Sequence, residues 1–119
     1  SGDESSFRAK VLRIIKMREK NWIIDMKYTE LRMNILKEVG AIGDYILRTK
    51  LYNVAMTCGL ISEEDYAAKK AELIKEVFAP YANMEEFQAK MNMLKRLHEE
   101  DIISTTEYDG YKNKIMNDL

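Results

Sequence analysis

The stretch CGLISEEDYAAKKAELI, residues 58–74, carries the signals that end one helix and begin the next. Gly59 predicts a helix end, because glycine enters the left-handed backbone conformation without strain. Ser62 followed by Asp65 is an acidic version of the capping box that starts a helix. The sequence therefore predicts a helical hairpin whose second helix ends before Pro80, since proline cannot continue a helix.

The same pattern occurs three times. The aligned positions are three tyrosines, Tyr28, Tyr66 and Tyr108, and three isoleucines, Ile23, Ile61 and Ile103. Ser104 and Glu107 form a full capping box in the third copy, whereas Ile24 replaces the serine in the first, where we expect Asp25 to cap one residue later. The spacings of 38 and 42 residues are typical of repeated supersecondary units. The repeat predicts that the three isoleucines are equivalent and buried.

This repetition predicts an all-α fold of three helical hairpins, which form a small bundle or a short solenoid. The predicted helices span residues 7–20, 25–38, 43–57, 63–78, 84–100 and 105–117. The hairpin units are residues 7–39, 43–79 and 83–119, within a single domain over 7–119. We expect residues 1–6, SGDESS, to be a tag remnant or a disordered tail.

Composition favours a cytoplasmic protein. The chain contains no apolar run near the roughly 18 residues of a membrane span, and it does not open with a signal peptide. A single cysteine, Cys58, cannot form an internal disulfide, which fits a reducing compartment. With His98 as the one histidine, a zinc site built from Cys and His is not expected.

At the turn, the sequence resembles the SHOCT (short C-terminal) domain, a bacterial helical hairpin. The matching residues are Gly59, Leu60, Ile61, Ser62, Glu63, Glu64, Tyr66, Lys69, Lys70, Leu73 and Ile74 in the second hairpin, and Leu94, Leu97, Ile103, Ser104, Glu107, Tyr108 and Lys112 in the third. The third hairpin differs from the SHOCT pattern in having Asp101 in place of the glycine. The first hairpin matches the pattern only at its apolar positions. The resemblance implies a role in oligomerisation or in nucleic-acid-associated assemblies, without catalytic residues.

The residues that could carry chemistry have structural explanations. His98 lies at a predicted helix end, where the helix dipole favours it, and Cys58 lies next to the turn glycine. The carboxylate groups at 63–65 and 85–86 stand at predicted helix starts. No glycine-rich phosphate loop is present. We therefore predict no catalytic, cofactor-binding or metal-binding residues, no small-molecule substrate and no enzyme activity.

Charge is unevenly distributed along the chain. Residues 7–39 carry nine Lys or Arg against four Asp or Glu, whereas residues 80–119 carry five against eight. The basic first helix has three interpretations: a solvated face, a surface for an acidic partner such as the third unit of another copy, or a surface for nucleic acid phosphates. The candidate partner-binding residues are Lys10, Arg13, Lys16, Lys20 and Trp22. Trp22 is equally consistent with an interface anchor and with a core residue.

Eight methionines and seven tyrosines are many for 119 residues, and both types adapt well to protein partners. The leading hypothesis is a non-enzymatic module for protein binding or self-association, of a bacterial or phage-type adaptor or regulator. A nucleic-acid-binding regulator that uses the first hairpin is the alternative. The residues expected to build the turns and core are Ile23, Tyr28, Gly59, Ile61, Ser62, Tyr66, Ile103, Ser104 and Tyr108.

Overall fold

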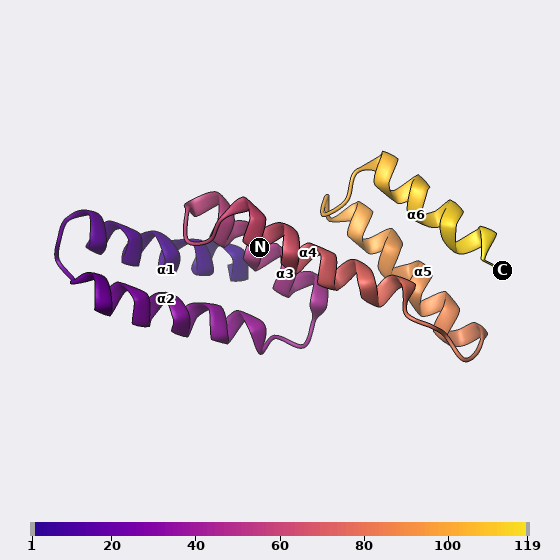
Figure 1. The fold of residues 1–119 in the computed structure, drawn as a ribbon, viewed down its shortest axis with the longest axis horizontal. Helices are drawn as coiled ribbons and strands as arrows, with labels where there is room; N and C mark the ends of the chain where they lie inside the picture. The colour runs from indigo at the N-terminus through magenta and orange to yellow at the C-terminus, as the bar shows by residue number, and fades with distance from the viewer. Residues whose placement is uncertain (1, 119) are drawn as a thin grey trace. The chain divides into compact units, whose positions relative to one another are not determined.

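The computed structural model describes residues 2–118, and this part of the chain contains helices and no strands (Figure 1). The helices are α1 (Gly2–Glu19), α2 (Asp25–Gly40), α3 (Tyr45–Cys58), α4 (Glu63–Phe78), α5 (Met84–Glu99) and α6 (Thr105–Asn117). The predicted all-α fold with six helices is confirmed for residues 2–118. The pairs α1–α2 and α5–α6 pack as hairpins, whereas α3 packs mainly on α1 and α2 and is joined to α4 by a turn of the same kind. Within residues 2–118, no helix has the length and apolar content that crossing a membrane requires.

The first helix begins earlier than the sequence predicted. Residues 2–6 are the first turns of α1, so the predicted disordered tail is wrong for these residues. Asp3 and Glu4 lie in the first turn, where negative charge is favoured by the partial positive charge of a helix N-terminus. Ser1 and Leu119, the ends of the predicted tail and domain, lie outside the described residues.

The chain divides into two compact units within the region predicted as a single domain. The first unit extends to Lys70 and the second begins at Ala71, so the division falls inside α4. Each unit has buried apolar side chains of its own, which are described separately below.

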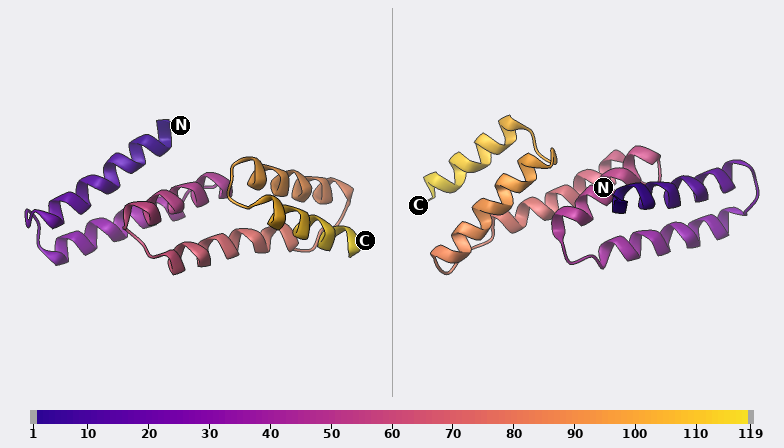
Figure 2. Two further views of the ribbon diagram at one scale, coloured as in Figure 1. Left: turned by 90° about the horizontal axis from the view of Figure 1, so that it is seen from above. Right: turned by 180° about the vertical axis from the view of Figure 1, so that it is seen from behind.

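In the first unit, α1 packs against both α2 and α3. Figures 1 and 2 show α1 and α2 running antiparallel from the turn that joins them. The core contains Val11, Ile14, Tyr28, Ile35, Val39, Leu51, Tyr52, Ala55, Leu60 and Ile61. Helical spacing explains this set, since Val11 and Ile14 lie one turn apart on one face of α1.

In the second unit, α5 and α6 pair antiparallel (Figure 1). Its buried apolar residues are Leu73, Val77, Leu94, Leu97, Ile102, Ile103 and Ile115. The rings of Phe78 and Tyr111 meet edge to face at 5.4 Å, and Lys114 lies 4.7 Å from the centre of the Phe78 ring. The last turns of α4 therefore pack on α6.

The three hairpin turns share one backbone geometry. Asn21, Gly59 and Asp101 have φ of 59°, 89° and 59°, and no other residue in 2–118 has a positive φ. In each turn the next amide donates back across the helix end: Trp22 to Met17 O at 2.9 Å, Leu60 to Ala55 O at 2.8 Å and Ile102 to Leu97 O at 2.9 Å. This is the Schellman motif. Asparagine and aspartate tolerate the left-handed conformation better than other non-glycine residues, which explains Asn21 and Asp101.

The second and third turns are followed by reciprocal caps. Ser62 Oγ accepts from Asp65 N at 3.0 Å, and Asp65 Oδ2 accepts from Ser62 N at 3.2 Å. Ser104 and Glu107 form the equivalent pair at 3.1 and 3.0 Å. Hydrogen bonds from the Ser62 backbone and then its side chain lower the pKa of Asp65. The first turn differs, because Ile24 occupies the cap position without a side-chain bond; the prediction that Asp25 caps this helix was wrong.

The residues expected to build the repeat lie as follows. Ile61 and Ile103 are buried, Ile23 is half-buried, and Tyr28 is buried while Tyr66 and Tyr108 are half-buried. A planar group covers the tyrosine in two of the hairpins: Arg18 lies 4.4 Å from the Tyr28 ring centre, and His98 stacks on Tyr108 at 4.9 Å. Arg18 and His98 are equivalent positions of the repeat, so the side-chain packing repeats as well as the backbone.

Candidate functional site

The turn between α1 and α2 exposes three large apolar side chains in succession. Trp22 is 67% exposed, Ile24 70% and Met26 77%. We call these three residues the first-hairpin tip. Trp22 and Ile24 lie in the turn and Met26 lies in the first turn of α2, and together they present apolar surface to solvent.

The equivalent positions of the other two hairpins are built differently. Leu60 and Ile102, which align with Trp22, are 3% and 8% exposed. Ser62 and Ser104 align with Ile24, and both cap a helix. An isoleucine is among the least favoured residues at a helix cap. The first hairpin therefore lacks a stabilising cap and exposes apolar area at the same place, a combination typical of a binding surface.

A basic face lies on α1 beside this tip. Arg13, Lys16 and Lys20 follow one another at spacings of three and four residues, which places them on one side of the helix. All three are exposed, and none forms an ion pair with another residue in the part of the chain that the structure describes. Leu12, 47% exposed, lies on the same side. We call these four residues the α1 outer face.

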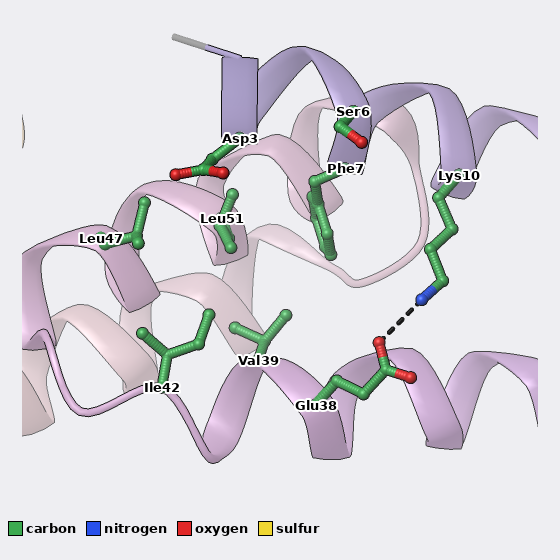
Figure 3. Close-up of a pocket in the computed structure, with 9 residues that line it drawn as sticks. All are labelled: Asp3, Ser6, Phe7, Lys10, Glu38, Val39, Ile42, Leu47 and Leu51. Carbon is green, nitrogen blue, oxygen red and sulfur yellow. Dashed lines mark hydrogen bonds and ion pairs between the residues drawn. The ribbon is translucent and has the colours of Figure 1, made fainter.

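Lys10, which the sequence grouped with this face, is placed elsewhere. Its Nζ lies 2.7 Å from Glu38 Oε2 on α2, so its charge is paired within the first hairpin (Figure 3). Arg18 is also engaged locally, with Nε 3.5 Å from Asp25 Oδ1. The structure therefore leaves Arg13, Lys16 and Lys20 exposed on α1 and Trp22 exposed in the turn that follows, and it pairs Lys10 with α2.

A cavity of about 330 Å³ opens between α1, α2 and α3 in the first unit. It is lined by Asp3, Ser6, Phe7, Lys10, Glu38, Val39, Ile42, Leu47 and Leu51. Figure 3 shows the apolar side chains facing one another across the cavity, with the pair of Lys10 and Glu38 at one side. Five of its nine lining side chains are apolar and four are polar or charged. The sequence did not predict it, because its walls come from three segments whose packing is not visible in the local pattern.

The two residues that most often carry chemistry have local partners. His98 Nε2 lies 3.0 Å from Thr105 Oγ1, in addition to its stacking on Tyr108. Cys58 Sγ accepts from Arg8 Nη1 at 3.8 Å. Among residues 2–118, no three His, Cys, Asp or Glu side chains come together as a group that could hold a metal ion. Both side chains are therefore engaged in contacts within the fold.

The sequence identified Trp22 but missed the exposure of its neighbours Ile24 and Met26. One signal was available: Ile24 occupies the position where both other hairpins carry a capping serine. An apolar residue at a position where the repeat carries a polar one is a local departure of the kind expected at functional or strained sites.

Comparison of the chain with models of known protein families, with curated proteins and with solved structures finds no match.

Proposed function

We propose that this chain is a non-enzymatic protein-binding module of adaptor or regulatory type that acts in the cytoplasm. The observation that carries the proposal is the first-hairpin tip, where Trp22, Ile24 and Met26 are all more than two-thirds exposed. Tryptophan is enriched among the residues that dominate binding energy, and methionine adapts to irregular surfaces. The kinship with SHOCT hairpins, and the oligomerising role that it implies, are part of this proposal.

The α1 outer face defines the chemistry of the partner. Arg13, Lys16 and Lys20 favour an acidic surface and accelerate its encounter with the module. The apolar tip requires a pocket or groove that can enclose an aromatic side chain. The partner is therefore a protein surface that combines carboxylates with an apolar recess.

A phage-displayed library of randomised helical peptides, selected on the immobilised chain, tests this proposal. We expect the enriched peptides to combine Asp or Glu with Leu, Phe or Trp. Replacing Trp22 by serine should weaken their binding at least about tenfold, since a buried tryptophan anchor contributes about 2 kcal/mol or more. Met33→Ser is the matched control, because Met33 is also exposed on the first hairpin but lies outside the tip. A library without enriched peptides, or peptides that bind Trp22→Ser as well as the parent chain, would contradict the proposal.

Mixed-sequence duplex DNA provides the test of the alternative, a nucleic-acid-binding regulator. Binding that falls steeply between about 50 and 200 mM salt, and that is lost when Arg13, Lys16 and Lys20 become Glu, would favour the alternative. The apolar contact proposed here depends much less on salt.

Replacing Ile24 by serine separates stability from binding. The serine completes the repeat pattern and should raise the free energy of unfolding by about 1 kcal/mol, as helix caps do. The same change removes one of the three apolar side chains of the tip, so the selected peptides should bind more weakly. Urea denaturation and peptide titration measure the two effects. Ser104→Ile is the opposite exchange at the equivalent cap and should lower stability by about the same amount. A destabilised Ile24→Ser chain would show that Ile24 serves the fold.

A further inference from the structure

Three side-chain contacts join the first hairpin to α3 and the turn that follows it. Glu4 Oε1 lies 3.3 Å from Lys50 Nζ, and Arg8 Nη1 donates to Cys58 Sγ at 3.8 Å. In addition, Arg32 Nε donates to the carbonyl oxygen of Leu60 at 2.8 Å, which fixes the second turn against α2. These contacts hold α3 and the turn that follows it against α1 and α2.

The repeat assigns an equivalent for each of these residues at the two ends of the chain. The tyrosines and the left-handed turn residues agree on a shift of 38 positions between the first and second hairpins and of 80 between the first and third. On the first-hairpin side of this contact, Glu4, Arg8 and Arg32 correspond to Met84, Gln88 and Lys112 in the third hairpin. On the other side, Lys50 and Cys58 of α3 and Leu60 of the following turn correspond to Leu12, Lys20 and Trp22 in the first hairpin.

The equivalent residues of the first and third hairpins can make favourable contacts in the same pairs as the residues of the internal contact. Leu12 is 47% exposed and Met84 is 72% exposed, so two solvent-exposed apolar side chains stand where the internal contact has an ion pair. Lys112 is exposed and can donate to the Trp22 carbonyl, as Arg32 donates to that of Leu60. Lys20 and Gln88 are also exposed and can share a hydrogen bond between ammonium and amide oxygen.

Charge favours the same pairing. The first hairpin, residues 2–40, carries nine basic against six acidic side chains, a net charge of +3, and residues 80–119 carry five against eight, a net of −3. Opposite charge on two surfaces steers their encounter and disfavours contact between like ends. Two first hairpins would repel each other, whereas a first and a third hairpin attract.

We propose that the chain associates head to tail, with the first hairpin of one copy docked on the α5–α6 hairpin of a second copy in the register of the internal contact. The contact places Leu12 on Met84, Trp22 beside Lys112, and the α1 outer face against the acidic hairpin. It rests on the proposed function, for which it names the partner as a second copy of this chain. Because the two surfaces differ, such a contact generates an open series or a closed ring.

Sedimentation velocity over a range of concentrations of the full chain tests this contact. We expect a concentration-dependent series of species for the parent. Replacing Leu12 by lysine, or Met84 by glutamate, should each weaken association at least about tenfold, because a charge then faces an apolar side chain. The double variant Leu12→Lys with Met84→Glu should recover association, since it reproduces the internal pair of Lys50 and Glu4. Met33→Lys, a charge added to an exposed methionine outside the contact, should have no effect.

The single tryptophan gives a second readout. Its emission should shift to shorter wavelength as the parent associates, and the shift should disappear in Met84→Glu, in which Trp22 itself is unchanged. Folding of each variant is checked by circular dichroism.

A parent that sediments as a monomer at every concentration, or a double variant as weak as its single variants, would overturn the head-to-tail contact. If the monomeric chain still selects peptides through Trp22, the binding module stands with a different partner. A chain that neither associates nor selects peptides overturns both proposals.

Discussion

Leu94→Ala is expected to unfold the α5–α6 hairpin under conditions in which the parent is folded. Leu94 is 0% exposed and aligns with Ile14 and Tyr52, which are buried in the first unit. Removing a buried leucine side chain costs about 2–5 kcal/mol, because the lost apolar contact and the cavity both contribute. The second unit has only about 50 residues, a size at which a core supplies little margin. A loss of this size is therefore a large fraction of the free energy of unfolding of the second unit.

Amide resonances of α5 and α6 in a heteronuclear NMR spectrum measure this effect directly. They should collapse toward random-coil positions in Leu94→Ala. Met116→Ala is the matched control, since Met116 lies on α6 at 42% exposure and its truncation should leave the spectrum dispersed. A Leu94→Ala chain with native resonances and an unchanged urea midpoint would show that the hairpin does not depend on this core.

Gly59→Ala is expected to lower the free energy of unfolding by about 1–2 kcal/mol, the cost of a left-handed conformation for a residue with a β-carbon. Gly59 has φ of 89°, and an added β-carbon would meet no atom within 4 Å. The penalty is therefore conformational and contains no steric clash. Loss of the turn would also release the bonds from the Gly59 and Leu60 amides to the end of α3.

The two other turns supply the converse experiment. Asn21→Gly and Asp101→Gly place glycine at φ of 59° and should leave stability unchanged or raise it by up to about 1 kcal/mol. Thermal unfolding monitored by circular dichroism compares the three variants. An alanine at position 59 without cost, or a glycine at 101 that destabilises strongly, would contradict the common turn geometry.

The sequence predicted the helices well because the signals that bound them are local. The boundaries at Gly59, Ser62 and Ser104 depend on residues within one turn of the helix end, and the structure reproduces them. The burial of Ile61 and Ile103 follows from the same repeat. The start of α1 was missed even though Asp3 and Glu4 are favourable there, because the small polar residues around them are typical of a tail.

What the sequence could not predict depends on packing between segments. The pairing of Lys10 with Glu38 and the cavity between α1, α2 and α3 require the tertiary arrangement of the first unit. The division inside α4 has no local signal, since the helix is continuous across Lys70 and Ala71. The exposure of Trp22 was undecided because a turn tryptophan can fold inward, as Leu60 and Ile102 do in the other hairpins.

The three matching turns have a consequence for how such a chain can evolve. Each of the three turns ends its first helix with the same backbone motif, and the second helix begins four residues after the left-handed residue. A tandem duplication or deletion of one hairpin, in steps of 38 to 42 codons, would therefore leave the signal that ends the first helix of each remaining hairpin intact. Selection could change the number of hairpins without redesigning any turn, and only the side chains at the two ends would need to adapt.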